Sequence, residues 1–194
     1  MTNNEEAVHH AVSFAAANTF IGLPQMKAYT SINIRFQIRT FESNGLLMYN
    51  AGKFYLWPFK ILKIKIILFQ LMKFCELIIL HFNTFTGKAS DFIAVELIRG
   101  KIHYILNLGY GPINIRDTST VNVSDNKWHE VSIGRPSRYR HTLMVDGHIT
   151  EQNTQGDNYH LDLDGILFLG NYGGSHIMFS KVYLQSYSSK TVEM

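Results

Sequence analysis

The feature that most constrains this chain is a strict alternation of apolar and polar side chains near its start. The stretch SINIRFQIRT, residues 31–40, has isoleucine or phenylalanine at every second position and polar side chains between them. Successive side chains of a strand point to opposite faces, so this period predicts a strand with one buried face. Ser43-Asn44-Gly45 predicts a turn, and LLMYN, residues 46–50, predicts a second strand that forms a hairpin with the first.

The second half of the chain also has short predicted strands separated by turn signals. Arg99-Gly100-Lys101 and Asp146-Gly147 are turn signals between such runs. The runs that predict strands are FIAVELI (92–98), IHYILNL (102–108), WHEVSIGR (128–135), TLMV (142–145), HITEQ (148–152) and GILFLG (165–170). This spacing is typical of an antiparallel all-β sandwich or barrel. AVSFAAANTF, residues 11–20, is ambiguous between helix and strand.

Composition excludes several classes of protein. The 194 residues fit one domain, and 46% hydrophobic residues are enough to bury a core. A net charge of +3 is too mild to indicate a nucleic-acid partner. A single cysteine excludes an internal disulfide and every multi-cysteine zinc motif. The nine histidines are scattered, and no nucleophile, phosphate-loop or dinucleotide motif is present, so we expect no enzymatic activity.

The first residues lack the pattern of a targeting signal. Residues 1–10 carry two glutamates where a secretory signal has basic residues, and we expect them to be disordered. On this pattern alone the chain is expected in the cytosol, unless its N-terminus is incomplete.

Residues 54–88 differ in kind from the rest, because they are dense in Phe, Ile, Leu and Lys without any period-two alternation. Three interpretations stay open. A transmembrane helix would have to bury Lys63, Lys65, Lys73 and Glu76. An amphipathic surface helix would have an unusually wide apolar face. The third interpretation is an insert foreign to the domain, such as a retained intron or a gene-model error. Its removal would leave an ordinary strand, turn and strand.

The motifs on either side of this segment resemble the laminin G-like (LNS) domain, closest in look to that of neurexins. They are FIGLPQMKAYTSINIRFQIRT (20–40), ESNGLLMYN (42–50), SDFIAVELIRGKIHYILNLGYGP (90–112), VSDNKWHEVSIGR (123–135), HTLMVDG (141–147) and LDLDGILFLG (161–170). The resemblance implies one domain over residues 11–190, an all-β antiparallel jelly-roll sandwich of the laminin G/concanavalin A-like type. It also implies an extracellular, non-catalytic module used in adhesion, and a buried Trp128 before the strand residue His129.

The C-terminal part departs from the family pattern. The closing strand of the family carries a cysteine, whereas the residues after Gly170 contain none. The usual disulfide is therefore impossible. IMFSKVYLQ, residues 177–185, alternates well and would still supply a strand.

The resemblance also implies a weak calcium site. Carried over onto this sequence, its ligands are the side chains of Asp91 and Asp162 and the backbone carbonyls of Leu108 and His160. Calcium prefers such a set of hard oxygen ligands. Residues 160 and 162 return to the same face of an extended chain, so the pair is geometrically reasonable.

A second candidate site is the basic group, defined as Arg135, Arg138, Arg140 and His141. Pro136 and Ser137 predict a loop between two strands that carries these residues. Arginine suits sulfate and carboxylate, so one interpretation of the group is binding of a heparan sulfate-type glycan or an acidic protein. The other is a solvated basic loop without a binding role. We therefore expect an extracellular or cell-surface protein as the main partner. The alternatives are a glycosaminoglycan- or carbohydrate-binding lectin, or a fragment that associates with membranes through residues 54–88.

Overall fold

The computed structural model describes residues 11–16, 19–26, 28, 30–52, 91–155, 160–172 and 177–187. The expectations for residues 1–10 and 54–88 lie outside these ranges. The described residues form twelve strands. Their bounds are β1 Val12–Phe14, β2 Thr19–Leu23, β3 Ser31–Thr40, β4 Asn44–Ala51, β5 Phe92–Ile98, β6 Lys101–Asn107, β7 Pro112–Arg116, β8 His129–Arg135, β9 Arg140–Val145, β10 His148–Asn153, β11 Leu167–Tyr172 and β12 Ile177–Tyr187. Among these residues, no helix is long and apolar enough to span a membrane.

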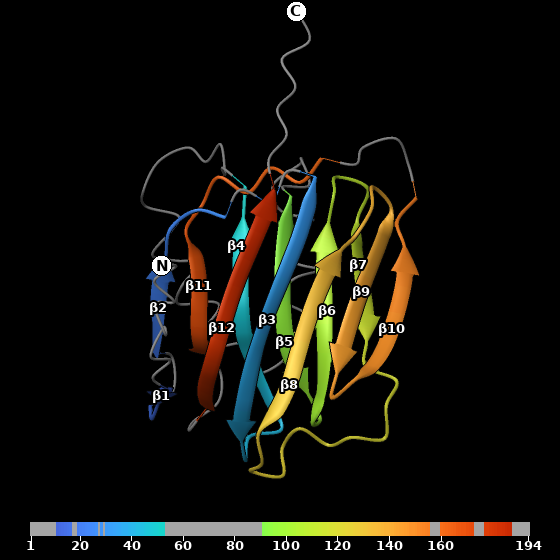
Figure 1. Cartoon of the computed structure of the whole chain (residues 1–194). Helices are drawn as coiled ribbons and strands as arrows, with labels where there is room; N and C mark the ends of the chain where they lie inside the picture. Colours follow the sequence, from blue (N-terminus) through green and yellow to red (C-terminus); the bar gives the residue numbers. More distant parts are fainter. Residues whose placement is uncertain are drawn as a thin grey trace, which may run out of the picture.

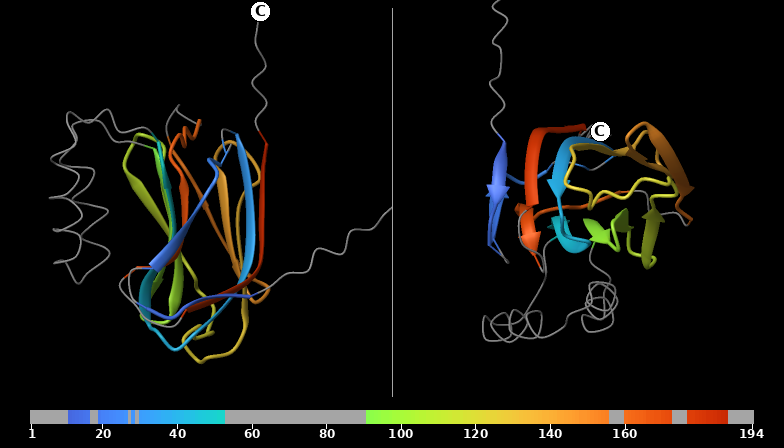
Figure 2. Two further views of the ribbon diagram at one scale, coloured as in Figure 1. Left: turned by 90° about the vertical axis from the view of Figure 1, so that its left-hand side faces the viewer. Right: turned by 90° about the horizontal axis from the view of Figure 1, so that it is seen from below.

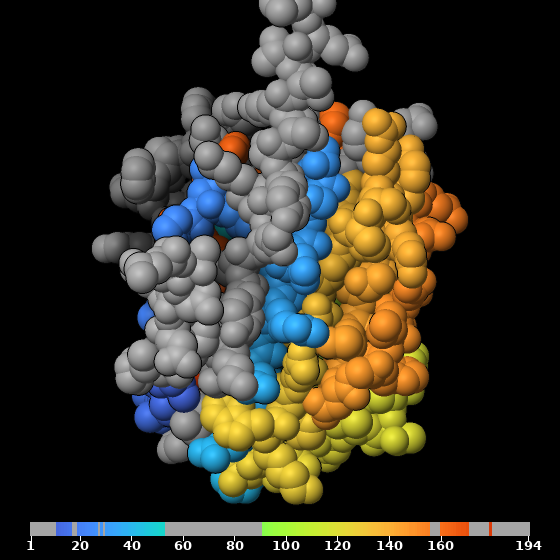
Figure 3. All heavy atoms as spheres, viewed as in Figure 1, coloured from blue at the N-terminus to red at the C-terminus, as the bar shows by residue number. Residues whose placement is uncertain are grey.

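The strands form two six-stranded antiparallel sheets that lie face to face (Figures 1 and 2). Sheet A has the order β1-β12-β3-β8-β9-β10, and sheet B has the order β2-β11-β4-β5-β6-β7. The outer face of sheet A lies at the molecular surface along β3, β8, β9 and β10 (Figure 3). This arrangement confirms the expected all-β sandwich of jelly-roll type.

The core lies between the sheets, and the alternation in β3 explains one side of it. Ile34, Phe36 and Ile38 are fully buried, whereas the residues between them face outward. Phe179 of β12 lies beside Phe36, with ring centroids 5.6 Å apart. Burial stabilises the fold by roughly 1.5–3 kcal/mol for each side chain of this size. The strand and the buried face predicted from residues 31–40 are confirmed.

The predicted hairpin between residues 31–40 and 46–50 is wrong. β3 pairs with β12 and β8 in sheet A, whereas β4 pairs with β11 and β5 in sheet B. The chain crosses from one sheet to the other at residues 41–43. Both strands bury an apolar face in the same core from opposite sides. Alternation therefore identified the strands correctly but carried no information about their partners.

Two other predicted turns do close hairpins. Arg99 and Gly100 join β5 to β6, and Asp146 and Gly147 join β9 to β10. All four residues have positive φ, between 47° and 85°. This conformation matches the twist of paired strands and favours glycine or a short polar residue.

The two ambiguous regions both form strands. Residues 11–20 contain β1 and the start of β2, which belong to different sheets. The C-terminal tail forms β12, which lies between β1 and β3. The closing strand is thus present without a cysteine. β7, which begins at Pro112, was not anticipated from the sequence.

The two strands on either side of residues 53–90 are direct neighbours. Ala51 at the end of β4 pairs with Phe92 at the start of β5. Just beyond them, the Gly52 N–H donates a hydrogen bond of 2.8 Å to the carbonyl of Asp91. β4 and β5 are therefore paired strands, as expected if a short turn joined them in place of residues 54–88. The origin of residues 54–88 stays a prediction.

Candidate calcium site and the polar clusters around it

Asp91 lies where β5 begins and is held on two sides. Its carbonyl accepts the Gly52 N–H, and its side-chain Oδ2 accepts the backbone N–H of Asp162 at 3.0 Å. The carboxyl group is half-buried. The structure therefore brings the two acidic residues of the predicted site together, although 71 positions separate them in the sequence.

Leu108 lies at the same end of sheet B as Asp91. The register pairs Phe92 with Asn107, so the next position on each strand places Asp91 opposite Leu108. The Leu108 side chain is buried. The Asn107 side-chain oxygen accepts the N–H groups of Gly109 at 2.8 Å and Gly111 at 3.1 Å, which shapes the chain just after Leu108.

The segment 160–166 carries the other two predicted ligands. Leu161 and Leu163 are buried and anchor it, while His160 is half-buried and Asp162 is exposed. The Gly165 N–H donates to the carbonyl of Ala51 at 2.9 Å. A side-chain carbon on Gly165 would lie 2.8 Å from that carbonyl oxygen, so only glycine permits this close approach.

Burial and several nearby groups act on the Asp91 carboxylate. Burial raises the pKa of Asp91, and the nearby negative charge of Asp162 raises it further, while the Asp162 N–H, Arg135 and His160 act in the opposite direction. Two carboxylates that repel each other would be stabilised by a shared positive ion. Among the described residues, no group of three His, Cys, Asp or Glu side chains gathers. The predicted donor set of two carboxylates and two backbone carbonyls would suit calcium better than zinc.

The basic group does not form one exposed loop as expected. Arg135 is the last residue of β8 and is fully buried, and its Nη2 donates to the carbonyl of Arg138 at 2.8 Å. His141 is the second residue of β9 and is also fully buried. Burial, reinforced by the Arg135 charge, lowers the pKa of His141 to about 4, so its ring is neutral. The surface position expected for these two residues is wrong.

Strand parity explains this correction. Val131, Ile133 and Arg135 fall on the same face of β8, and His141 shares its face of β9 with Leu143 and Val145. The alternation of apolar and polar residues in the sequence therefore places both Arg135 and His141 on the inward face of their strands. That signal was available before the structure, but the residue types and Pro136 suggested a loop instead.

Arg138 and Arg140 are the exposed members of the basic group. Arg140 forms a two-pronged ion pair with Glu151 on the neighbouring β10, through Nε and Nη2. The side chains of this pair are 51% and 44% exposed, so the pair contributes little to stability.

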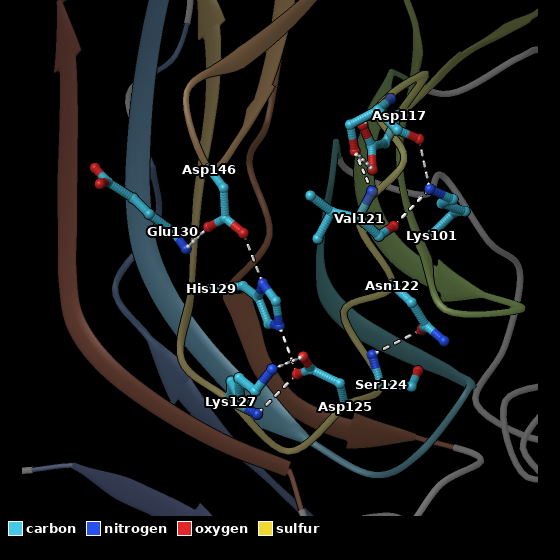
Figure 4. Close-up of polar contacts among 11 residues, drawn as sticks. Lys101, Asp117, Val121, Asn122, Ser124, Asp125, Lys127, His129, Glu130 and Asp146 are labelled. Atoms are coloured by element: carbon cyan, nitrogen blue, oxygen red, sulfur yellow. Dashed lines mark hydrogen bonds and ion pairs between the residues drawn. The ribbon is translucent and has the colours of Figure 1, made fainter.

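The loop 117–128 meets the start of β8 at the opposite end of the sandwich (Figure 1), and a third polar cluster lies there (Figure 4). His129 is buried between two carboxylates, with Nδ1 2.7 Å from Asp146 and Nε2 2.8 Å from Asp125. Burial works against the charged ring, but the hydrogen bonds to Asp146 and Asp125 outweigh it and raise the pKa of His129. The sequence reasoning treated His129 as an ordinary strand residue and missed this arrangement.

Trp128 also departs from expectation. The residue is 40% exposed, and its ring lies against the Arg39 guanidinium, 5.3 Å from the ring centroid. It precedes β8 and sits at the surface rather than in the core, so its predicted burial is wrong.

A family model for the laminin G domain matches residues 77–190, more than half of the chain. The chain belongs to the laminin G domain family. This membership confirms the resemblance drawn from the motifs, together with the sandwich architecture that it implies. As a laminin G domain, the chain is a binding module of the kind found in extracellular adhesion proteins, a class that is generally non-catalytic.

The laminin G domain is similar along most of its length to curated neurexins. It is 37% identical to neurexin 1 of Drosophila melanogaster over 174 residues, which are 90% of this chain. It is 33% identical to neurexin-3a of Danio rerio over 162 residues, which are 84% of this chain. The chain spans about 7% of the length of each of these relatives.

Solved structures support the same fold. The laminin G domain is similar to domains LG4-5 of the mouse laminin alpha1 chain, with a TM-score of 0.62 and 20% identity. That match covers 92% of this chain and 43% of the laminin chain. The receptor binding domain of botulinum neurotoxin D shares the fold more distantly, with a TM-score of 0.54, 11% identity and coverage of 92% and 41% of the two chains. At these identities the likeness concerns the fold alone.

Proposed function

We propose that this laminin G domain is a calcium-dependent binding module of an extracellular adhesion protein. The ion is held by the side chains of Asp91 and Asp162 and the carbonyls of Leu108 and His160. The observation that carries the proposal is the 3.0 Å hydrogen bond from the Asp162 N–H to Asp91, which brings two acidic residues from distant parts of the chain to one place.

The surroundings of these residues support the assignment. Asp91 directly precedes β5 and Leu108 directly follows β6, next to the paired residues Phe92 and Asn107. The hydrogen bond from Gly165 to Ala51 holds the segment that carries Asp162. The charge of Asp162 acts on Asp91, and a cation shared by the two carboxylates would relieve their repulsion.

A bound calcium ion would supply positive charge at this end of the sandwich and accept oxygen ligands from a partner. The residues of the chain hold the ion, and Asp162 and His160 lie at or near the surface, where a partner reaches them. Few protein ligands imply weak affinity, on the order of 10⁻⁴–10⁻³ M, as in other extracellular modules. We propose a cell-surface or extracellular protein with acidic or hydroxyl oxygens as the partner.

Calorimetric titration of the full chain with CaCl2 tests the proposal. We expect binding by the unmodified chain and a loss of at least about tenfold in affinity for Asp91→Asn and Asp162→Asn, equivalent to about 1.4 kcal/mol each. Asp164→Asn is the matched control, because Asp164 lies in the same segment, is exposed, and bonds Gln25 at 3.3 Å. Binding that survives both substitutions, or that Asp164→Asn removes equally, would refute the site.

Glycan binding through Arg138 and Arg140 is the second candidate function. The observation that favours it is the hydrogen bond from buried Arg135 to the Arg138 carbonyl, which fixes the loop that presents both exposed arginines. Binding of this kind would depend strongly on salt and not on calcium. The effect of chelator on partner binding therefore separates the two candidates.

A further inference from the structure

A cluster of three polar side chains lies in the core between the two sheets. Arg135 and His141 come from sheet A, and Tyr104 comes from β6 of sheet B. All three are 0% exposed, although residues of these types usually keep part of their surface in water. Neither of the two candidate functions uses the side chain of Tyr104 or His141.

The strand register brings the members of this cluster together. Gly134 of β8 pairs with Thr142 of β9. The next residues, toward the end of β8 and the start of β9, are Arg135 and His141. The ring of Tyr104 lies beside that of His141 across the core, with centroids 6.2 Å apart. The Arg135 charge acts on both rings, because it opposes the rise that burial causes in the pKa of Tyr104 and lowers the pKa of His141.

Three buried polar atoms of the cluster have no hydrogen-bond partner among the described residues. They are the Tyr104 hydroxyl and both ring nitrogens of His141. Buried polar atoms in proteins almost always form a hydrogen bond, because burial without one costs free energy. A small polar molecule that reaches both side chains would satisfy these atoms.

The protonation state of His141 determines which molecule fits. Its pKa of about 4 leaves the ring neutral, so one nitrogen donates a hydrogen bond and the other accepts one. An anion accepts hydrogen bonds but cannot donate one, so it would leave the accepting nitrogen unpaired. Water both donates and accepts, and a buried water typically forms about three hydrogen bonds. Water therefore fits a hydroxyl and a neutral imidazole, even beside the guanidinium of Arg135.

We propose that an internal water molecule bridges Tyr104 and His141 and thereby joins the two sheets. The water bonds the Tyr104 hydroxyl on one side and the ring nitrogens of His141 on the other. It lies beside Arg135, whose hydrogen bond to the Arg138 carbonyl fixes the loop after β8. The bridge thus connects the packing of the core with this loop. It involves none of the four proposed calcium ligands, so it stands or falls separately from the calcium site.

A double-mutant cycle in the full chain tests the bridge. Tyr104→Phe removes only the hydroxyl, and His141→Leu removes both ring nitrogens. In chelator, we expect Tyr104→Phe to lower the urea midpoint of unfolding by about 0.5 M in the unmodified background and by clearly less in the His141→Leu background. Tyr110→Phe is the matched control, because Tyr110 is 64% exposed, and it should leave the midpoint unchanged in both backgrounds.

The sign of the Tyr104→Phe effect separates a bridged hydroxyl from an unpaired one. An unpaired hydroxyl in the core would make phenylalanine the more stable residue, so a higher midpoint would overturn the proposal. Losses that add fully in the double variant would overturn it as well. A midpoint that rises with chloride concentration at constant ionic strength would assign the place to an anion and reject the water.

NMR of the unmodified chain provides a second test should the variants not fold. A bound water that stays in place for long enough gives rotating-frame Overhauser signals to nearby protein protons. We expect such signals from water to the ring protons of both Tyr104 and His141. Their absence in the folded, assigned chain would contradict the bridge.

Discussion

Nδ1 of His129 lies 2.7 Å from Oδ2 of Asp146, which joins the first residue of β8 to the turn between β9 and β10. The other ring nitrogen contacts Asp125 in the loop 117–128. Both nitrogens can donate only when the ring is doubly protonated, so the charged form of His129 connects three parts of this end of the sandwich.

The first prediction concerns pH. The pKa of His129 is raised above its ordinary value of 6.5, so its contribution to stability is fully present below that value. It is lost as the pH rises through the higher pKa of the folded state. We compare the unmodified chain with His129→Gln from about pH 6 to about pH 9, and expect the difference in unfolding free energy to be largest below pH 6.5 and to shrink as the pH rises above that value.

Urea unfolding of both proteins across this range measures the difference. Asp125 keeps its negative charge throughout this range, because the hydrogen bond with His129 lowers its pKa to about 2. A difference that is constant from pH 6 to pH 9 would mean that His129 is neutral in the folded protein.

The second prediction concerns Asp91 without calcium. Its raised pKa means that the folded state disfavours the charged carboxylate, chiefly through burial and also through Asp162. Asparagine retains an oxygen that accepts the Asp162 N–H. We therefore expect Asp91→Asn to unfold at a slightly higher temperature than the unmodified chain in chelator at neutral pH. Added calcium should reverse this order, because only the unmodified chain gains stability from the ion.

The third prediction concerns Gly165. Because Gly165 has no side chain, the segment 160–166 packs closely against the Ala51 carbonyl. The methyl group of Gly165→Ala would push this segment away from Ala51. We expect a loss of about 1–3 kcal/mol in unfolding free energy and weaker calcium binding. Gly22→Ala is the control, since its new carbon would make only an ordinary contact of 3.4 Å with Ile166. Denaturant unfolding and calorimetry report the two effects.

The fourth prediction separates the members of the basic group. Arg138→Ala with Arg140→Ala should lower the salt concentration that elutes the chain from heparin. Arg135→Met should have a smaller effect, because Arg135 is buried and does not reach a glycan, and it acts only through its hydrogen bond to the Arg138 carbonyl. Removing the Arg135 charge should instead raise the pKa of His141 above its value of about 4, which an NMR titration measures. A loss of heparin retention in folded Arg135→Met as large as that of the double variant would contradict this division of roles.

Strand content was predictable from the sequence because period-two alternation is a local property. It located β3, and the turn signals at Arg99-Gly100 and Asp146-Gly147 located two hairpins. The partner of β3 was not predictable in this way, because pairing with β8 and β12 depends on contacts between distant parts of the chain. β7 was not predicted because it begins at Pro112, directly after the turn-like residues Gly109-Tyr110-Gly111.

The candidate site shows the same division. The motifs indicated Asp91 and Asp162, and the structure brings the two together through a single hydrogen bond. Their roles as ligands stay predictions until calcium is titrated. For Arg135 and His141 residue chemistry was misleading, because a guanidinium and an imidazole suggested a surface that strand parity excludes.

The hydrogen bond between Gly52 and Asp91 has a consequence for how this domain tolerates change. The two strand ends meet there, so the pairing of β4 with β5 is the same whatever number of residues joins them. The entropy cost of closing such a connection grows only with the logarithm of its length. We therefore expect new sequence, a reporter domain or a pair of new chain termini at this point to cost the domain little stability.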